Sequence, residues 1–495
     1  MTLTSEDTAL DPDLLLDGVH LIGGDWVPAR SGQTIDVVNP ANRAVLARVP
    51  RGGAEDVDAA VAAAEGALPA WRDLDAASRG RHLFAWADLI DAHGAELDEL
   101  ERQEMGRPSW GPPRMGGQLR YTAGLADKVQ GQSLPTFSPD ALALTLREPY
   151  GVVGVIIPWN APGPQFVMEV GAAIAAGNTI VVKPAEDAPL TPLALAKLAL
   201  EAGIPPGVIN VVTGYGAEAG AAVPSHPKIR RVGFTGSPVT GRAVMEACAK
   251  NLTPLHLELG GKSPQVVFPD ADLEAAVPQM TFSITLNTGQ VCAAGSRIVV
   301  HRSVHAELVD RLAAQMQQVT VGPWHRPVAM GPLINATQHE RVLGYIDVGK
   351  ESGAELVVGG GVPRGDGLAD GFFVEPTLFD KVDPASRIAQ EEIFGPVLSV
   401  IPVDDEEEAL AVANGTEYGL VASVWTRDVG TAVRMSRRLQ AGQVGVNSVL
   451  GAPAIGAPWG GYKSSGFGRT MGADAVLEWT QVKTVSLRDA APPGR

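Results

Sequence analysis

Residues 231–241 read Arg-Val-Gly-Phe-Thr-Gly-Ser-Pro-Val-Thr-Gly and join an apolar strand, a glycine turn and the start of a helix. Gly236 permits a tight turn, Ser237 offers a hydroxyl group, and Pro238 suits the first position of a helix. A helix that begins directly after a strand presents free N–H groups, which favour an anion such as a pyrophosphate. Many such turns bind nothing, so the stretch is a weak ligand motif. It does predict the strand–turn–helix unit of an α/β fold.

The same alternation extends over most of the chain. Short apolar or β-branched runs occupy residues 152–157, 179–182, 208–212, 230–234 and 255–259, and a second series occupies 298–301, 354–358, 397–401, 421–425 and 443–446. Helical spacing is found at 55–68, 78–101, 273–288, 304–319 and 431–439. Strands separated by helices predict parallel sheets covered on both faces, so we expect two doubly wound domains that meet near Gly260.

Residues 130–147 break this pattern, because Pro and Ser punctuate an extended run at 141–146. With residues 480–487, this run could form a projecting ribbon. Exposed apolar strand edges usually find a partner, so we expect a homodimer or homotetramer, without a choice between them.

Composition excludes several classes of protein. A chain of 495 residues with 45% hydrophobic residues is long and apolar enough for two or three compact domains. A net charge of -17 disfavours nucleic acid and anionic membrane surfaces as partners. Two cysteines form no disulfide framework, and residues 1–17 do not resemble a signal peptide. We therefore expect a cytoplasmic protein without a membrane span, and no metal site.

Cys292 lies in Gly-Gln-Val-Cys-Ala-Ala-Gly-Ser-Arg at 289–297, a stretch too rich in small residues for ordinary core. A thiolate is a strong nucleophile, and small neighbours leave it accessible. The alternative is an inert core cysteine, which fits Cys248 well because Cys248 lies among apolar residues of an expected helix.

Two further side chains could complete a catalytic site. Glu258 is a carboxylate on an otherwise apolar strand, and Asn160 follows the apolar run at 152–157. A buried carboxylate costs free energy, and a side-chain amide can donate hydrogen bonds to a developing oxyanion. Glu258 could instead pair with Lys262, and Asn160 could cap a turn.

A nucleotide is indicated by Lys183 and Glu186, which follow the strand at 179–182. Nucleotides bind at the carboxyl edge of open α/β sheets. Glu186 could accept hydrogen bonds from ribose hydroxyls and would repel a 2′-phosphate, which favours NAD over NADP. The usual GxGxxG motif is absent, and a surface Lys–Glu pair remains an alternative.

Together these residues resemble the NAD(P)-dependent aldehyde dehydrogenase superfamily over nearly the whole chain. Seven motifs stand in the family's order: Pro-Trp-Asn at 158–160, Lys-Pro-Ala-Glu at 183–186, Gly-Phe-Thr-Gly-Ser at 233–237, Leu-Glu-Leu-Gly-Gly-Lys at 257–262, Gly-Gln-Val-Cys at 289–292, Glu-Glu-Ile-Phe-Gly-Pro at 391–396 and Pro-Trp-Gly-Gly-Tyr-Lys-Ser-Ser-Gly at 458–466. The resemblance implies a Rossmann-like NAD-binding domain at 1–129 and 148–259, a catalytic domain at 260–470, and an oligomerisation ribbon at 130–147 and 471–495.

The resemblance also implies roles for individual residues. Cys292 would attack the aldehyde carbon, Asn160 would hold the oxyanion with the Cys292 N–H, and Glu258 would activate the water that hydrolyses the thioester to an acid. The implied NAD-binding residues are Trp159, Lys183, Glu186, Gly236, Ser237, Glu392 and Phe394. Because the helix expected at 273–288 ends just before Cys292, its dipole does not favour a thiolate. We expect local amides and the positively charged nicotinamide to stabilise it.

Several positions depart from the family. Residues 161–164 read Ala-Pro-Gly-Pro and lack side-chain volume, which suggests a bulky or aromatic aldehyde. Glu169 replaces a common lysine and Thr470 a common glutamate, so the resemblance does not carry over a proton path to Glu258. His256 shares a strand face with Glu258 and could tune it or simply pack.

Other classes of protein make different predictions. A cysteine hydrolase could use Cys292 with His256 and would need no cofactor. A CoA-acylating enzyme would release the thioester to CoA, whereas Glu258 favours water. A structural protein would tolerate loss of the cysteine, the base or the amide, yet all three are present.

Overall fold

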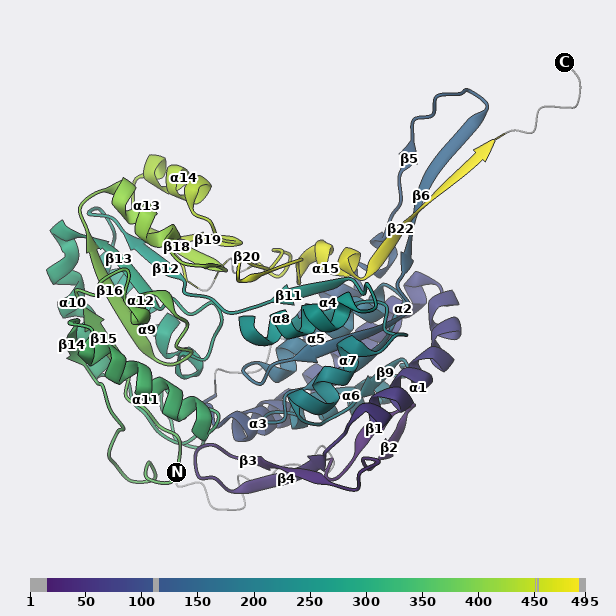
Figure 1. Ribbon diagram of the computed structural model, residues 1–495, viewed down its shortest axis with the longest axis horizontal. Coiled ribbons are helices and arrows are strands. Elements are labelled where there is room, and N and C mark those ends of the chain that lie inside the picture. Colours follow the sequence, from purple (N-terminus) through teal and green to yellow (C-terminus); the bar gives the residue numbers. More distant parts are fainter. Residues whose placement is uncertain (1–15, 110–114, 450, 452–453, 489–495) are drawn as a thin grey trace, which may run out of the picture.

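The computed structural model describes residues 16–109, 115–449, 451 and 454–488. It contains two large sheets, each covered by helices, and a long ribbon that projects from the body (Figure 1). Both sheets are parallel at their centres, which confirms the predicted α/β class with two doubly wound units. The chain ends at 1–15 and 489–495, included in the predicted domain ranges, lie outside the described residues, and the exact domain limits stay a prediction.

The first sheet has eight strands. Their order is β2 (Asp25–Val27), β1 (His20–Ile22), β9 (Ile209–Val211), β8 (Thr179–Pro184), β7 (Val152–Ile157), β10 (Val232–Thr235), β11 (Leu255–Glu258) and β21 (Gly466–Phe467). The five central strands are parallel and fall within two residues of their predicted bounds. The strands β1, β2 and β21 are antiparallel, with β2 and β21 at the two edges of the sheet. The strand order reverses between β7 and β10, and ligands of open α/β sheets bind at such a point.

Helices cover this sheet with apolar faces. They are α1 (Ala54–Asp73), α2 (Ala76–Ala92), α3 (Gly94–Met105), α4 (Met115–Ala123), α5 (Pro162–Ala175), α6 (Leu190–Glu201), α7 (Ala221–Ser225) and α8 (Pro238–Ala249). The continuous helix expected at 78–101 is wrong, because α2 ends before His93 and α3 begins at Gly94. Leu83, Trp86 and Leu97 are nevertheless all buried in one core, so the helical spacing correctly marked the apolar side of both helices.

The second sheet has seven strands. Their order is β14 (Glu355–Val358), β15 (Thr377–Asp380), β16 (Val397–Val403), β13 (Arg297–His301), β12 (Pro264–Val267), β18 (Val421–Trp425) and β19 (Gln443–Val446). Only the β14–β15 pair is antiparallel. The sequence did not indicate β12 and β15, which have four residues each and no alternation that separates them from their flanks.

Helices also cover the second sheet. They are α9 (Leu273–Thr285), α10 (Arg302–Gln317), α11 (Ala336–Glu351), α12 (Arg387–Gln390), α13 (Glu406–Asn414) and α14 (Val429–Arg438). The helix expected at 273–288 ends earlier, at Thr285, and a 3-10 turn η3 (Leu286–Gly289) follows.

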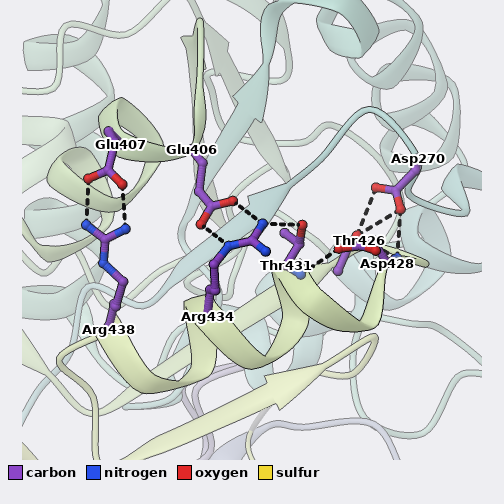
Figure 2. Close-up of polar contacts among 8 residues, drawn as sticks. All are labelled: Asp270, Glu406, Glu407, Thr426, Asp428, Thr431, Arg434 and Arg438. Carbon is purple, nitrogen blue, oxygen red and sulfur yellow. Dashed lines mark hydrogen bonds and ion pairs between the residues drawn. The ribbon is translucent and has the colours of Figure 1, made fainter.

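Polar contacts fix α14 to its surroundings at the molecular surface (Figure 2). Two arginines of α14 face carboxylates of α13, and Asp270, after β12, accepts hydrogen bonds from the loop that precedes α14. These contacts are Arg434 with Glu406, Arg438 with Glu407, and Asp270 with the Thr426 hydroxyl and the backbone N–H groups of Arg427 and Asp428. The exposed ion pairs contribute little, whereas the carboxylate that receives backbone N–H groups fixes the entry of the helix.

The ribbon is formed by β6 (Ala141–Pro149), β22 (Thr480–Arg488) and the short β5 (Ser133–Leu134). Pairing runs without a break from Thr480 opposite Pro149 to Arg488 opposite Ala141. The predicted partners therefore meet, and the ribbon extends away from both sheets (Figure 1). Leu142, Val482 and Leu487 are about half exposed, and a role of the ribbon in assembly stays a prediction.

Across the described part of the chain, no helix combines the length and apolar character needed to cross a membrane.

Candidate active site

A cleft with about 1300 Å³ of free space, including its open mouth, is lined by residues from both halves of the chain. Residues that follow β7, β10 and β11 form one wall. The opposite wall contains Cys292, residues of α11 and the segment before β16. All predicted site residues line this cleft except Lys183 and Glu186.

The reversal of strand order places two sequence-distant segments side by side. Trp159 and Asn160 follow β7, and Gly236 and Ser237 follow β10, which pairs with β7. The Ser237 hydroxyl accepts a hydrogen bond from the Thr240 N–H at 3.2 Å, so Ser237 caps α8, which begins at Pro238 as the sequence suggested. The start of α8 therefore borders the cleft, where its dipole favours an anion.

Lys183 and Glu186 lie one strand away at the same sheet edge. Lys183 stands opposite Ile156 of β7, and its ammonium donates a hydrogen bond to Glu186 at 2.7 Å. Lys183 is only 2% exposed, so an ordinary surface ion pair does not describe it. A buried ammonium at the carboxyl edge of a sheet is a candidate for ligand binding.

A tightly bent loop presents Cys292. Asn287, Thr288 and Gly289 adopt positive φ angles of 48°, 58° and 72° in succession. A Cβ atom on Gly289 would lie 2.3 Å from the Gly395 carbonyl group, so only glycine fits there. The Gln290 side chain ties the loop down, because it donates to the Asn287 carbonyl at 3.0 Å and accepts from the Ile334 N–H at 2.9 Å.

Asn160 contacts this same loop. Its side-chain amide donates to the Gln290 carbonyl at 3.0 Å, and its backbone carbonyl accepts from the Asn287 side chain at 2.9 Å. The amide nitrogen carries two N–H bonds, and one remains for a ligand in the cleft. Asn160 is thus hydrogen-bonded to the loop that carries Cys292. The alternative that Asn160 only caps a turn after β7 does not account for this contact.

The two cysteines are free and differ in surroundings. Cys248 is buried in α8, where burial raises its thiol pKa to about 11, as expected for a packing residue. Cys292 is partly exposed and lines the cleft. Burial, together with the carboxylates of Glu392 and Glu258, raises the Cys292 pKa to about 12. The cleft without ligand therefore favours the neutral thiol.

Glu258 ends β11 and is 4% exposed. Neither carboxylate oxygen has a hydrogen-bond partner within the described residues. Burial raises the pKa of Glu258 well above its ordinary value; Glu169 and Glu478 raise it further, and Arg469 opposes them. A carboxylate with a raised pKa beside a thiol is suited to proton transfer.

The alternative pairing of Glu258 with Lys262 is wrong. The Lys262 ammonium is also buried without a hydrogen-bond partner in the described structure. Burial and the nearby Arg297 lower the pKa of Lys262 to about 7, against the opposing effect of Glu392. Glu258 is left to face the cleft.

Glu392 and Phe394 form the far wall. Glu392 accepts a hydrogen bond from the Gly261 N–H at 2.9 Å, and burial raises its pKa to about 7. Phe394 has a positive φ of 61° and meets the Trp159 ring edge to face, with centroids 5.4 Å apart. The two rings come from opposite halves of the chain and border one continuous space.

Two lining residues of α11 were not identified from the sequence. Gln338 donates to the Phe394 carbonyl at 2.8 Å, and Arg341 donates to the Glu392 carbonyl at 2.6 Å. They hold the segment that carries Glu392 and Phe394. The only local signal was their spacing on one helix, which is also typical of ordinary surface residues.

The cleft fits a dinucleotide. It has a helix start that favours an anion, a carboxylate at Glu392 that could accept hydrogen bonds from hydroxyl groups, and aromatic rings at Trp159 and Phe394. Lys183 and Glu186 form a polar pair at β8, the strand next to β7, and do not belong to the residues that line the cleft.

Comparison with known proteins extends these observations. Residues 26–485 match the model of the aldehyde dehydrogenase family. The chain is 43% identical over 472 residues to the putative aldehyde dehydrogenase DhaS of Bacillus subtilis, with 94% of each chain covered. It is 43% identical to a phenylacetaldehyde dehydrogenase of Pseudomonas fluorescens over 98% of this chain and 99% of the relative. The structure of an aldehyde dehydrogenase from Bacillus cereus with NAD+ superposes with a TM-score of 0.93 at 42% identity, covering 97% of this chain and 99% of that one.

Proposed function

The chain belongs to the aldehyde dehydrogenase family, and from that premise we propose that it oxidises an aldehyde to the carboxylic acid, with hydride transfer to NAD, through a covalent intermediate on Cys292. The observation that carries the proposal is the meeting of Cys292, Asn160 and Glu258 in one cleft, although they come from three distant segments. Such a set supplies a nucleophile, an oxyanion donor and a base.

NAD is the cofactor, as in the solved complex of the Bacillus cereus relative. When bound, it supplies the hydride acceptor. We assign Lys183 and Glu186 to the adenosine ribose, Gly236 and Ser237 to the pyrophosphate, Glu392 to the nicotinamide ribose, and Trp159 with Phe394 to the ring. The partly buried Lys183–Glu186 contact and the start of α8 at the cleft support this assignment.

Two steps are proposed for the residues of the chain. The Cys292 thiolate forms a C–S bond to the aldehyde carbon, and the carbonyl oxygen becomes an oxyanion that accepts hydrogen bonds from the free Asn160 N–H and the Cys292 backbone N–H. Loss of hydride from this tetrahedral carbon leaves a thioester. Glu258 then takes a proton from water, the water oxygen bonds to the thioester carbon, and the C–S bond breaks to release the acid and the thiolate.

The finer proposal for the substrate is a bulky or aromatic aldehyde. It is supported by the small Ala161 beside Asn160 and by the similarity to a phenylacetaldehyde dehydrogenase. Gly163 adds no support, because a Cβ there would meet Glu101 and Met115, so packed side chains fill its space. Residues 449–459 are a further segment that the sequence suggests would shape the pocket, and residues 450 and 452–453 of this segment lie outside the described residues.

Two alternative enzymes are less well supported. A hydrolase that uses Cys292 with His256 conflicts with the position of His256, whose Nε2 contacts Glu169 at 3.2 Å. An enzyme that transfers the acyl group from the thioester to CoA would not need the buried Glu258 as a base for hydrolytic water. An assay for CoA dependence decides this second case.

We also propose a homo-oligomer, dimer or tetramer, joined through the ribbon, and a cytoplasmic location. Half-exposed apolar side chains on β6 and β22 support the first, and two unpaired cysteines support the second.

The central experiment is a screen of aliphatic and aromatic aldehydes that follows NADH formation. Cys292→Ala should abolish turnover, whereas the matched control Cys248→Ala should retain it. Glu258→Ala should give an initial burst of NADH and then stall, because the thioester forms but is not hydrolysed. Normal turnover by the Glu258 variant would remove Glu258 as the base.

A further inference from the structure

A hydrogen bond between Asp187 and Asn335 joins the two halves of the chain. The Asn335 side-chain amide donates to the Asp187 carboxylate at 3.1 Å, and both residues are partly buried. Asp187 directly follows Glu186, which accepts a hydrogen bond from Lys183 of β8. Asn335 directly precedes α11, in the half that carries Cys292. Neither Asp187 nor Asn335 belongs to the cleft lining, so their effect on a ligand of the cleft must pass through other residues.

Asn335 makes a second contact, as the N-cap of α11. Its side-chain oxygen accepts a hydrogen bond from the Gln338 N–H at 2.9 Å, while its side-chain nitrogen contacts Asp187. The two contacts use different atoms of one amide group. The substitution Asn335→Asp keeps the capping oxygen but removes the N–H donor that Asp187 accepts. The cap of α11 and the link between the halves can therefore be separated experimentally.

The helix α11 in turn holds the segment that carries Glu392 and Phe394. Gln338 donates to the Phe394 carbonyl at 2.8 Å, and Arg341 donates to the Glu392 carbonyl at 2.6 Å. A Cβ atom on Gly395 would lie 2.5 Å from a side chain of the same helix, so helix and segment are in close contact. The position of α11 therefore sets the position of Glu392 and Phe394 in the cleft.

The residues assigned to NAD lie on both halves of the chain. Glu186 is assigned to one ribose, and Glu392 and Phe394 to the nicotinamide end. One cofactor molecule can contact all three only if the two halves are held in a fixed relation. A link that holds them before NAD binds leaves less to be ordered on binding, and so raises the affinity.

We propose that Asp187 and Asn335 are positioning residues for the cofactor: their hydrogen bond holds α11, and with it Glu392 and Phe394, in the place that NAD requires relative to Glu186. This inference rests on the proposed function, which assigns these last three residues to NAD. Asp187 and Asn335 take no part in the chemical steps.

Exchange of amide and carboxylate tests the link. Asn335→Asp places a second carboxylate against Asp187, so the dissociation constant of NAD should rise by roughly 10-fold. Asp187→Asn keeps an oxygen that accepts from Asn335 and should bind NAD nearly as the wild type does. The double variant restores a donor and an acceptor in reversed order, so its dissociation constant should return close to the wild-type value. If Asn335 only capped α11, Asn335→Asp would have no effect, because both residue types cap helices equally well.

The dissociation constant is measured by isothermal titration calorimetry on each full-length variant, and KM for NAD and kcat are measured with an aldehyde that the wild type oxidises. KM for NAD should rise in Asn335→Asp while kcat at saturating NAD changes little, as expected when binding alone is weakened. Asp405→Asn is the matched control. It exchanges a carboxylate for an amide at the N-cap of α13, where Asp405 accepts from the Glu408 N–H at 2.9 Å, and it should leave NAD binding unchanged.

The outcomes separate the inference from the proposed function. Weaker NAD binding in Asn335→Asp that the double variant repairs supports the inference. Normal binding in Asn335→Asp, or a defect that the double variant does not repair, overturns the inference and leaves the proposed function intact. A wild type that binds NAD but forms no NADH with any aldehyde overturns the proposed function, and the dissociation constants still decide the inference. Should Asn335→Asp fail to fold, Asp187→Ala, which leaves the cap of α11 in place, must weaken NAD binding for the inference to survive.

Discussion

Addition of NAD to the free enzyme should shift the pH dependence of Cys292 alkylation to lower pH. Without a ligand, burial, Glu392 and Glu258 raise the pKa of this thiol from 9.0 to about 12. At pH 8 the thiolate fraction is then about one in ten thousand, against about one in ten for an ordinary thiol. The preceding helix α9 does not offset this, because its C-terminal end at Thr285 is the end nearer to Cys292 in the sequence, and the bent turn η3 separates the two.

The positively charged nicotinamide is the cation proposed to reverse this. An opposite charge close to an ionisable group lowers an acid's pKa by about 1–3 units, so alkylation at pH 8 should accelerate by roughly 10- to 1000-fold. The assay treats the protein with iodoacetamide at a series of pH values, with and without NAD, and measures the modified peptides by mass spectrometry. The pH at the midpoint of each alkylation profile is compared rather than the rate at one pH. A bound cofactor could slow the access of iodoacetamide to Cys292 at every pH and still leave this midpoint unchanged.

Cys248 provides an internal control. It is buried in α8, so its midpoint should not respond to NAD. Coincident Cys292 profiles with and without NAD would refute the proposed part of the cofactor. A midpoint near 9 in the free protein would refute the structural argument that the cleft disfavours the thiolate.

Three further predictions concern the site and the surface. Asn160→Ala should lower the rate of NADH formation by about 100- to 1000-fold with NAD affinity unchanged, because one oxyanion donor is lost; an unchanged rate in stopped flow would contradict this role. Since burial raises the pKa of Glu392 to about 7, its carboxylate becomes neutral as pH falls through that value, so the KM for NAD should rise below about pH 7 in the wild type. Glu392→Gln should show a high KM at every pH, and a persistent transition near pH 7 would count against the assignment. Asp270→Ala should lower the midpoint of thermal unfolding, because two backbone N–H groups lose their acceptor and the free energy of unfolding falls by about 1–2 kcal/mol. Arg438→Ala removes only an exposed ion pair and should change the midpoint little. A larger effect of Arg438→Ala than of Asp270→Ala would contradict the contacts in Figure 2.

The sequence predicted the sheets well where strands were continuous apolar runs. Residues 152–157 form β7 without a shift of either end, and the pairing of 141–146 with 480–487 was expected. Runs of this kind are dictated by burial on both faces, which is visible locally. The strands β12 and β15 were not predicted, because each has only four residues and pairs with strands that are far away in the sequence.

Some residues of the site could likewise be predicted from the sequence and others could not. Cys292, Glu258 and Asn160 stood out because each residue type is unusual in its local stretch, and the structure brings them to one cleft. Gln338 and Arg341 did not, since their contacts are backbone carbonyls more than fifty residues away, at Phe394 and Glu392. The contact of His256 with Glu169 was equally hidden, because it joins a strand to a helix 87 residues earlier.

The pairing of β22 with β6 has a consequence for biosynthesis. Strand β6 is centred on residue 145, yet its partner β22 begins at Thr480, and β21, which pairs with β11 at the edge of the first sheet, begins at Gly466. While the second half is translated, a nascent chain therefore leaves two strand edges unpaired: the edge of β6 that will pair with β22 and the edge of β11 that will pair with β21. Both pairings therefore form only after the residues of the second sheet have been synthesised, and these strand edges stay unpaired until then.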